Sequence, residues 1–293
     1  GNPDYFNLVA GVSAGTIIGN IAWGLGYFGQ PHIITRFMAL RSPSEAKAAR
    51  RTGSIWVAIC YLGGIFTALV ATVYFGQKSA SVTDQSGYET VFLDLARIMF
   101  HPLIAGIVLT AVLAAIMSTM SSQLLVTSSA LIEDIYRIFK KNPNNTTLLV
   151  LSRAMVIGVA LIGMLLALNP SDTILGLVGF AWAGFGSAFG PVVVASLYWK
   201  RLTSQGAIAG MIVGAVTSFV WGSIDSLSGI IYEIVPGVIL ATLAMVIVSL
   251  ATRPKEGVAE EFDTAAAATD YALAHPDEDF AAALRNRGGS TAV

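Results

Sequence analysis

The chain has 293 residues, of which 55% are hydrophobic and only 12% are charged. Soluble domains carry about 25% charged residues, so this composition indicates an integral membrane protein. The formal net charge is −1, which argues against an electrostatic surface for nucleic acid. Cys60 is the only cysteine, so it has no intrachain disulfide partner.

Seven segments have the hydropathy and length of membrane spans, which need about 20 apolar residues. They are expected at 8–30, 53–76, 102–126, 147–168, 173–198, 206–224 and 230–251. Charged, Pro-rich or Asn-rich breaks separate them. The segment 87–100 is too charged to span and predicts a short amphipathic surface helix. The third span is expected to continue as a helix to Arg137.

Basic residues gather in alternate loops, which predicts the orientation of the chain. The loops 36–51 and 133–146 are rich in Lys and Arg, whereas 169–172 and 225–229 contain neither. The positive-inside rule therefore places the N-terminus outside and the C-terminus in the cytoplasm. Residues 1–251 are expected to form a seven-span domain. The tail, 252–293, is expected to be cytoplasmic and partly disordered, with one helix near 258–274.

The segment 20–39, NIAWGLGYFGQPHIITRFMA, combines aromatic residues with helix-breaking residues. The helix breakers are Gly24, Gly26, Gly29 and Pro31. Glycine weakens a helix and proline removes a donor, so this segment is expected to be discontinuous. Trp23, Tyr27 and Pro31 recur every four residues and are expected to share a face up to the break. That face fits either the wall of a substrate pocket or an interfacial aromatic belt.

The segment 114–129, AAIMSTMSSQLLVTSS, is a hydroxyl-rich part of an apolar helix. At 100° per residue, Ala115, Ser118 and Thr119 fall on one small and hydroxylated stripe. Two hydroxyls and a backbone carbonyl suit a sodium ion, which needs several oxygen ligands. The alternative is that these hydroxyls bond to the carbonyl one turn back, or permit close helix packing.

The segment 176–199 is rich in glycine and includes Gly190-Pro191, which predicts a bend. A packing face and a gating hinge both fit these small residues. The chain shows no catalytic constellation, because its few acidic residues near the spans lie at span ends, where capping is the ordinary role. An enzyme is therefore not expected.

Four separated runs in the chain carry a resemblance to a known family. They are WGLGYFGQPHIITRFMA, LAAIMSTMSSQLLVTSSALIEDIYR, LGLVGFAWAGFGSAFGPVV and YEIVPG. Up to about residue 252, the chain resembles the sodium:solute symporter family. The resemblance implies an all-α integral membrane protein with the LeuT-type fold, built from two inverted five-helix repeats. This chain would supply the second repeat, core helices six to ten, and two additional C-terminal spans.

The resemblance also implies roles for residues already singled out. The backbone oxygen of Ala115 and the hydroxyls of Ser118 and Thr119 would bind sodium, the co-transported ion. Trp23, Tyr27 and Pro31 would serve substrate binding and the outer gate. The expected partners are the lipid bilayer, Na⁺ and a small solute, with L-proline favoured, in a bacterial inner membrane; no nucleic acid is expected.

The family's first half, including core helix one, is absent from the sequence. The chain is therefore expected to be a C-terminal fragment that needs the missing N-terminal half and is inactive alone. The sequence leaves three alternatives open. The chain could be a transporter-like membrane sensor, a structural membrane subunit, or part of a symporter for a different organic solute.

Overall fold

The structure is a computed structural model that describes residues 7, 10–77, 85–140, 144–168 and 173–275. All regular secondary structure within those residues is helical. The chain divides into two compact units. One unit combines Gly1–Arg51 with Leu175–Val293, and the other is Thr52–Ile174.

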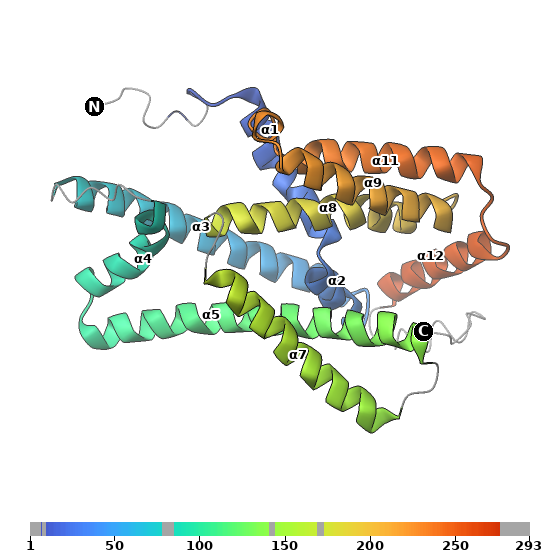
Figure 1. Cartoon of the computed structure of the whole chain (residues 1–293), viewed down its shortest axis with the longest axis horizontal. Coiled ribbons are helices and arrows are strands. Elements are labelled where there is room, and N and C mark those ends of the chain that lie inside the picture. The colour runs from blue at the N-terminus through green and yellow to red at the C-terminus, as the bar shows by residue number, and fades with distance from the viewer. Residues whose placement is uncertain (1–6, 8–9, 78–84, 141–143, 169–172, 276–293) are drawn as a thin grey trace. The chain divides into compact units, whose positions relative to one another are not determined.

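Both units are built of helices, which Figure 1 colours in chain order. The first unit contains α1 (Ala14–Ala22), η1 (Trp23–Gly29), α2 (Pro31–Met38), α8 (Ile174–Tyr198), α9 (Ser204–Gly222), α10 (Asp225–Ser228), α11 (Ile234–Ala251) and α12 (Val258–Ala274). The second unit contains α4 (Gln85–Met99), α5 (Pro102–Ser129), η2 (Ala130–Tyr136), α6 (Arg137–Phe139) and α7 (Asn145–Ala167). The long helix α3 (Glu45–Gln77) begins in the first unit and continues into the second.

Six helices among the described residues are long and apolar enough to cross a membrane. They are Glu45–Gly76, Pro102–Phe139, Thr146–Ala167, Ile174–Tyr198, Ser204–Gly222 and Ile234–Ala251. Each coincides with one of the seven predicted spans. The remaining prediction, 8–30, does not correspond to one long helix, because the chain there is divided among α1, η1 and the start of α2.

The break in this first segment has a local cause that the sequence predicts. Ser13 begins α1, and its hydroxyl accepts a hydrogen bond from the Thr16 N–H at 3.1 Å. From Trp23 to Gly29 the chain forms a tighter 3₁₀ helix. Gln30 is then extended, and Pro31 restarts an α-helix at its first turn, where proline's missing N–H costs nothing. The predicted discontinuity is confirmed.

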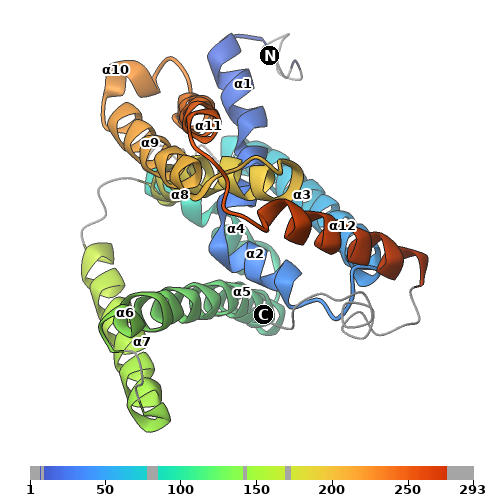
Figure 2. The same cartoon turned by 90° about the vertical axis from the view of Figure 1, so that its right-hand side faces the viewer.

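The helices α9 and α11 lie side by side and antiparallel, as both views show (Figures 1 and 2). Their contact follows small residues at every fourth position of α9, which let the backbones approach closely. Added side-chain carbons would meet the partner helix in matched pairs: Gly206 with Ser249, Gly210 with Met245, Gly214 with Ala241, and Gly237 with Ser218.

Buried hydroxyl groups join α8 to this helix pair. Ser218 of α9 donates to Ser187 of α8 at 2.8 Å, and Ser187 donates to the Ile234 carbonyl at 3.5 Å. Both serine side chains are almost fully buried. Bonding them to each other and to carbonyls satisfies groups that would otherwise be costly to bury. The helix α8 continues through Gly190-Pro191, so the predicted bend there does not end the helix.

In the second unit, α5 continues through the π-helical turn η2 into α6, which confirms the predicted extension to Arg137. α5 packs against α7, and the Ser128 hydroxyl donates to the Ser152 carbonyl at 3.0 Å. α4 confirms the short helix predicted at 87–100 and contacts α5.

The tail forms the predicted helix, α12, after Gly257 adopts a left-handed backbone with φ of 89°. Lys200, two residues after α8, pairs with Asp263 of α12, and its ammonium lies 5.6 Å from the centre of the Phe262 ring. The predicted disorder of the tail concerns residues 276–293, which lie outside the described residues.

Candidate functional site

The two predicted groups of site residues lie in different units. Trp23, Tyr27 and Pro31 belong to the first unit, and the Ala115–Thr119 stripe belongs to the second. Each group is therefore described by its contacts within its own unit.

Trp182 of α8 is the centre of an aromatic cluster around the broken helix. Its ring stacks on Trp23 with centroids 5.5 Å apart, and it meets Tyr27 edge-on at 4.8 Å. Its indole N–H donates to the Trp23 carbonyl at 2.9 Å. Trp182 therefore joins two of the predicted aromatic residues, although it was not itself among the predicted site residues.

The 3₁₀ geometry of η1 changes how Trp23 and Tyr27 are related. A 3₁₀ helix has three residues per turn, so positions four apart are rotated by about a third of a turn. The predicted sharing of one helical face assumed the α-helical repeat. What brings the two rings together is their common neighbour Trp182. Pro31 follows the break and begins α2, where it is partly buried.

Gln30 spans the break and is held from the opposite element. Its side chain is 4% exposed, and its amide N–H donates to the Trp182 carbonyl at 3.3 Å. Next to it, Gly29 lies directly against the backbone of α8. A side chain at Gly29 would collide with the Phe185 carbonyl oxygen and approach the Gly186 Cα to 2.7 Å. The broken helix is thus fixed to α8 by backbone proximity and hydrogen bonds.

Trp182→Phe should lower the thermal midpoint of the purified protein by roughly 2–8 °C, because it removes the N–H that satisfies the Trp23 carbonyl. The measurement is thermal unfolding in detergent. Trp56→Phe is the matched control, since Trp56 is 67% exposed on α3. Equal midpoints for the two variants would contradict the anchoring role of Trp182.

Tyr232 completes the aromatic cluster from the segment before α11. Its ring stacks on Trp23 at 5.8 Å, and its hydroxyl donates to the Gly179 carbonyl at 2.6 Å. Burial, and secondarily the neighbouring Glu233 carboxylate, raise the pKa of Tyr232 well above its usual value. The phenol therefore stays protonated and remains a hydrogen-bond donor. Tyr232 occurs in the quoted run YEIVPG, but no spacing in the sequence points to its partner.

Two hydroxyls of the α5 stripe form hydrogen bonds along their own helix. Thr119 donates its hydroxyl hydrogen to the Ala115 carbonyl at 3.3 Å, and Ser122 donates to the Ser118 carbonyl at 2.9 Å. These are bonds to the preceding turn, as the packing alternative expects. They leave lone pairs on the Thr119 hydroxyl oxygen and on the Ala115 carbonyl. Two oxygens 3.3 Å apart can face one cation together.

Among the described residues, no group of three or more His, Cys, Asp or Glu side chains could hold a metal ion. The Ala115 carbonyl and the Ser118 and Thr119 hydroxyls therefore stay the predicted ligands of an alkali-metal ion. Ser128, by contrast, is 2% exposed and bonded to the Ser152 carbonyl of α7, which gives it a packing role.

Comparison with known proteins finds one matching family model and several similar proteins. Residues 3–214 match the model of the sodium:solute symporter family. The chain is 47% identical over 264 residues to the high-affinity proline transporter PutP of Bacillus subtilis (strain 168), covering 89% of this chain and 55% of the relative. It is 48% identical over 254 residues to the osmoregulated proline transporter OpuE of the same organism, covering 86% of this chain and 51% of the relative.

A third relative is the sodium/proline symporter of Escherichia coli (strain K12). It is 46% identical over 247 residues, covering 83% of this chain and 49% of the relative. The chain thus spans about half the length of the curated relatives it matches. No solved structure matches the chain at a significant level.

Proposed function

We propose that this chain, which belongs to the sodium:solute symporter family, forms part of a carrier that couples Na⁺ entry to uptake of L-proline. The observation that carries the proposal is identity of 46–48% to three proline transporters across more than four-fifths of the chain. The six long apolar helices are consistent with a multi-pass membrane protein. We place it in a bacterial inner membrane with the C-terminus in the cytoplasm, as the loop charges predict.

The proposed architecture is the LeuT-type fold, with this chain supplying core helices six to ten and two further spans. Support comes from the broken segment α1–η1–α2, because such carriers place discontinuous helices at the substrate site. The chain accounts for about half of its relatives' length. We therefore propose that transport also requires residues equivalent to the other half.

The proposed sodium ligands are the Ala115 carbonyl and the hydroxyls of Ser118 and Thr119. The 3.3 Å separation between the Ala115 and Thr119 oxygens supports this assignment. Further ligands would come from the half of the relatives that the chain does not span. Neutral oxygens suit a co-transported ion, since binding must be weak enough to allow release on the inner side.

Trp23, Tyr27 and Pro31 are proposed to line the substrate site and its outer gate. Trp182 fixes the rings of Trp23 and Tyr27, so movement of α8 relative to the broken helix would alter this wall. In the proposed cycle Na⁺ binds first and favours the outward-open state, in which the solute binds more tightly. That order requires Na⁺ to interact differently with the two states.

A chimera tests the proposal. Residues 3–252 of this chain would replace the matching segment of the B. subtilis transporter PutP in cells without other proline uptake. We expect proline uptake that requires Na⁺, and no uptake by this chain expressed alone. A chimera that reaches the membrane yet transports proline without Na⁺, or transports only a different solute, would contradict it. So would uptake by the chain alone.

A further inference from the structure

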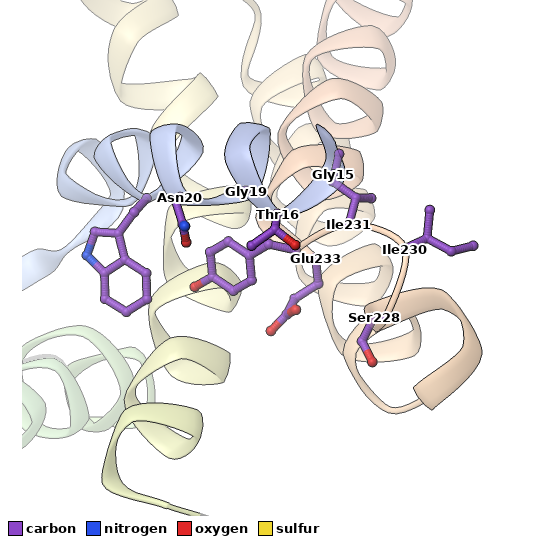
Figure 3. A pocket seen from close by; sticks show the side chains of 11 residues that line it. Gly15, Thr16, Gly19, Asn20, Ser228, Ile230, Ile231 and Glu233 are labelled. Atoms are coloured by element: carbon purple, nitrogen blue, oxygen red, sulfur yellow. The ribbon is translucent and has the colours of Figure 1, made fainter. Parts of the chain in front are cut away.

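A small cavity lies between α1 and the segment that leads into α11 (Figure 3). Its volume is about 240 Å³. The lining side chains that matter here are Thr16, Asn20, Trp23, Ser228, Tyr232 and Glu233. They come from α1, the start of η1, α10 and the residues before α11. Figure 3 shows Thr16 and Asn20 on α1 and Glu233 on the opposite element around the same opening.

Two glycines of α1 create this arrangement. A side-chain carbon at Gly15 would collide with the Ile230 carbonyl oxygen, and one at Gly19 would lie 2.9 Å from the Tyr232 Cβ. The helix backbone therefore rests directly against residues 230–232. Thr16 and Asn20 each follow one of these glycines and are four residues apart, so they point to one side of α1.

Glu233 is the charged group of the cavity. Its side chain is only 7% exposed, and it is in none of the ion pairs formed within the described part of the chain. Burial raises the pKa of this carboxyl, while its own backbone N–H opposes the rise. A buried carboxylate without a cationic partner is costly, and a bound cation would remove that cost.

The walls next to Glu233 indicate what kind of cation fits. Trp23 and Tyr232 stack at 5.8 Å and both line the cavity. Aromatic faces attract organic ammonium groups, which can also make apolar contacts there. The Tyr232 hydroxyl is already directed to the Gly179 carbonyl, so it donates its hydrogen away from any guest. An alkali-metal ion would use the oxygen atoms of the lining and would make no apolar contact with the aromatic walls.

We infer that this cavity binds a small organic ammonium ion, with Glu233 as its counter-ion, Trp23 and Tyr232 as its aromatic wall, and Asn20 as a polar contact. The site differs from the sodium ligands proposed on α5, which belong to the other unit. Trp23 belongs both to this wall and to the aromatic cluster around Trp182. The inference concerns binding and does not depend on which solute the carrier moves.

The test uses the full 293-residue chain purified in detergent, with trimethylammonium chloride as the probe. Saturation-transfer NMR on the probe's methyl protons gives its dissociation constant. Glu233→Gln keeps the side-chain shape and should weaken binding at least about tenfold. Asp225→Asn is the control, because Asp225 is an exposed carboxylate that does not line the cavity, and it should leave the constant unchanged.

A variant that is expected to bind the probe more tightly distinguishes a direct effect on binding from weaker binding caused by misfolding. Asn20→Asp adds a second carboxylate to the wall and should tighten binding several-fold. Circular dichroism would check that each variant keeps its helix content. The inference would be overturned if Glu233→Gln binds the probe as tightly as the unchanged chain does. It would also be overturned if Na⁺ displaces the probe at concentrations lower than those at which the probe itself binds. This test measures binding, whereas the chimera test measures transport. Failure of the inference can therefore be distinguished from failure of the proposed function.

Discussion

Thr119→Ala should raise the Na⁺ concentration needed for half-maximal proline uptake at least about tenfold in the chimera. The change removes one of three proposed oxygen ligands, and a polar contact to a charged partner contributes about 1.5–3 kcal/mol. A loss of 1.4 kcal/mol corresponds to about a tenfold change in the binding constant. Ser118→Ala should have an effect of the same direction and size. Radiolabelled proline uptake over a series of Na⁺ concentrations measures both.

Two controls separate ion binding from helix packing. Thr119→Ser keeps the hydroxyl and should retain most of the Na⁺ affinity. Thr110 makes the same kind of bond to the preceding turn, donating to the Gly106 carbonyl at 2.8 Å. It lies nine residues before Thr119 and therefore on the opposite side of α5. If Thr110→Ala and Thr119→Ala shift the Na⁺ dependence equally, the sodium assignment is wrong.

Gly29→Ala should remove most of the folded, transport-competent chimera. The added methyl group would collide with the Phe185 carbonyl oxygen and lie 2.7 Å from the Gly186 Cα. These are backbone atoms of α8, so they cannot move aside as a flexible side chain could. Overpacking of this kind costs about 1–3 kcal/mol or more. Thermal unfolding in detergent and proline uptake would both report the loss.

Gly24→Ala is the matched control for Gly29→Ala. Gly24 lies in the same 3₁₀ segment, yet a side-chain carbon there meets nothing within 4 Å. Both substitutions remove the same glycine freedom from the unfolded chain, and that effect alone is slightly stabilising. Equal losses in the two variants would show that flexibility of the segment matters and not its contact with α8.

The features predicted well from the sequence are those set by local composition and by local breaks. Six long helices and the discontinuity before Pro31 follow from apolar length, glycine and proline, and the helix of the tail follows from an alanine-rich composition. A hydropathy window reads 8–30 as one span because it averages over the break. The glycines in this segment predict the break that the hydropathy window misses. The structure shows that the chain there is divided among α1, η1 and α2.

The features that were missed depend on partners far apart in the sequence. Gln30 is a buried polar residue whose partner is a backbone carbonyl of residue 182. A carbonyl has no sequence signature. Trp182 and Tyr232 became significant only through ring contacts with Trp23. The cavity beside Glu233 likewise needs α1 and the 230–232 segment to meet.

One missed feature could have been found by counting. Small residues occupy every fourth position of α9 from Gly206 to Gly222, which is the spacing that permits close helix contact. The sequence predicts a packing face for the glycine-rich run 176–199, but no such face was predicted for 206–222. The position of the partner residues on α11, such as Ala241 and Ser249, still required the structure.

The antiparallel contact between α9 and α11 also bears on how the protein assembles. The two helices are joined by residues 223–233, and hydrogen bonds link them at both ends. Trp221 donates to the Ile231 carbonyl at 3.1 Å at one end, and the Thr203 and Thr252 hydroxyls lie 2.7 Å apart at the other. Neighbours in sequence lose little chain entropy on pairing. The pair is thus a helical hairpin that can form early after insertion and provide the surface on which α8 then docks.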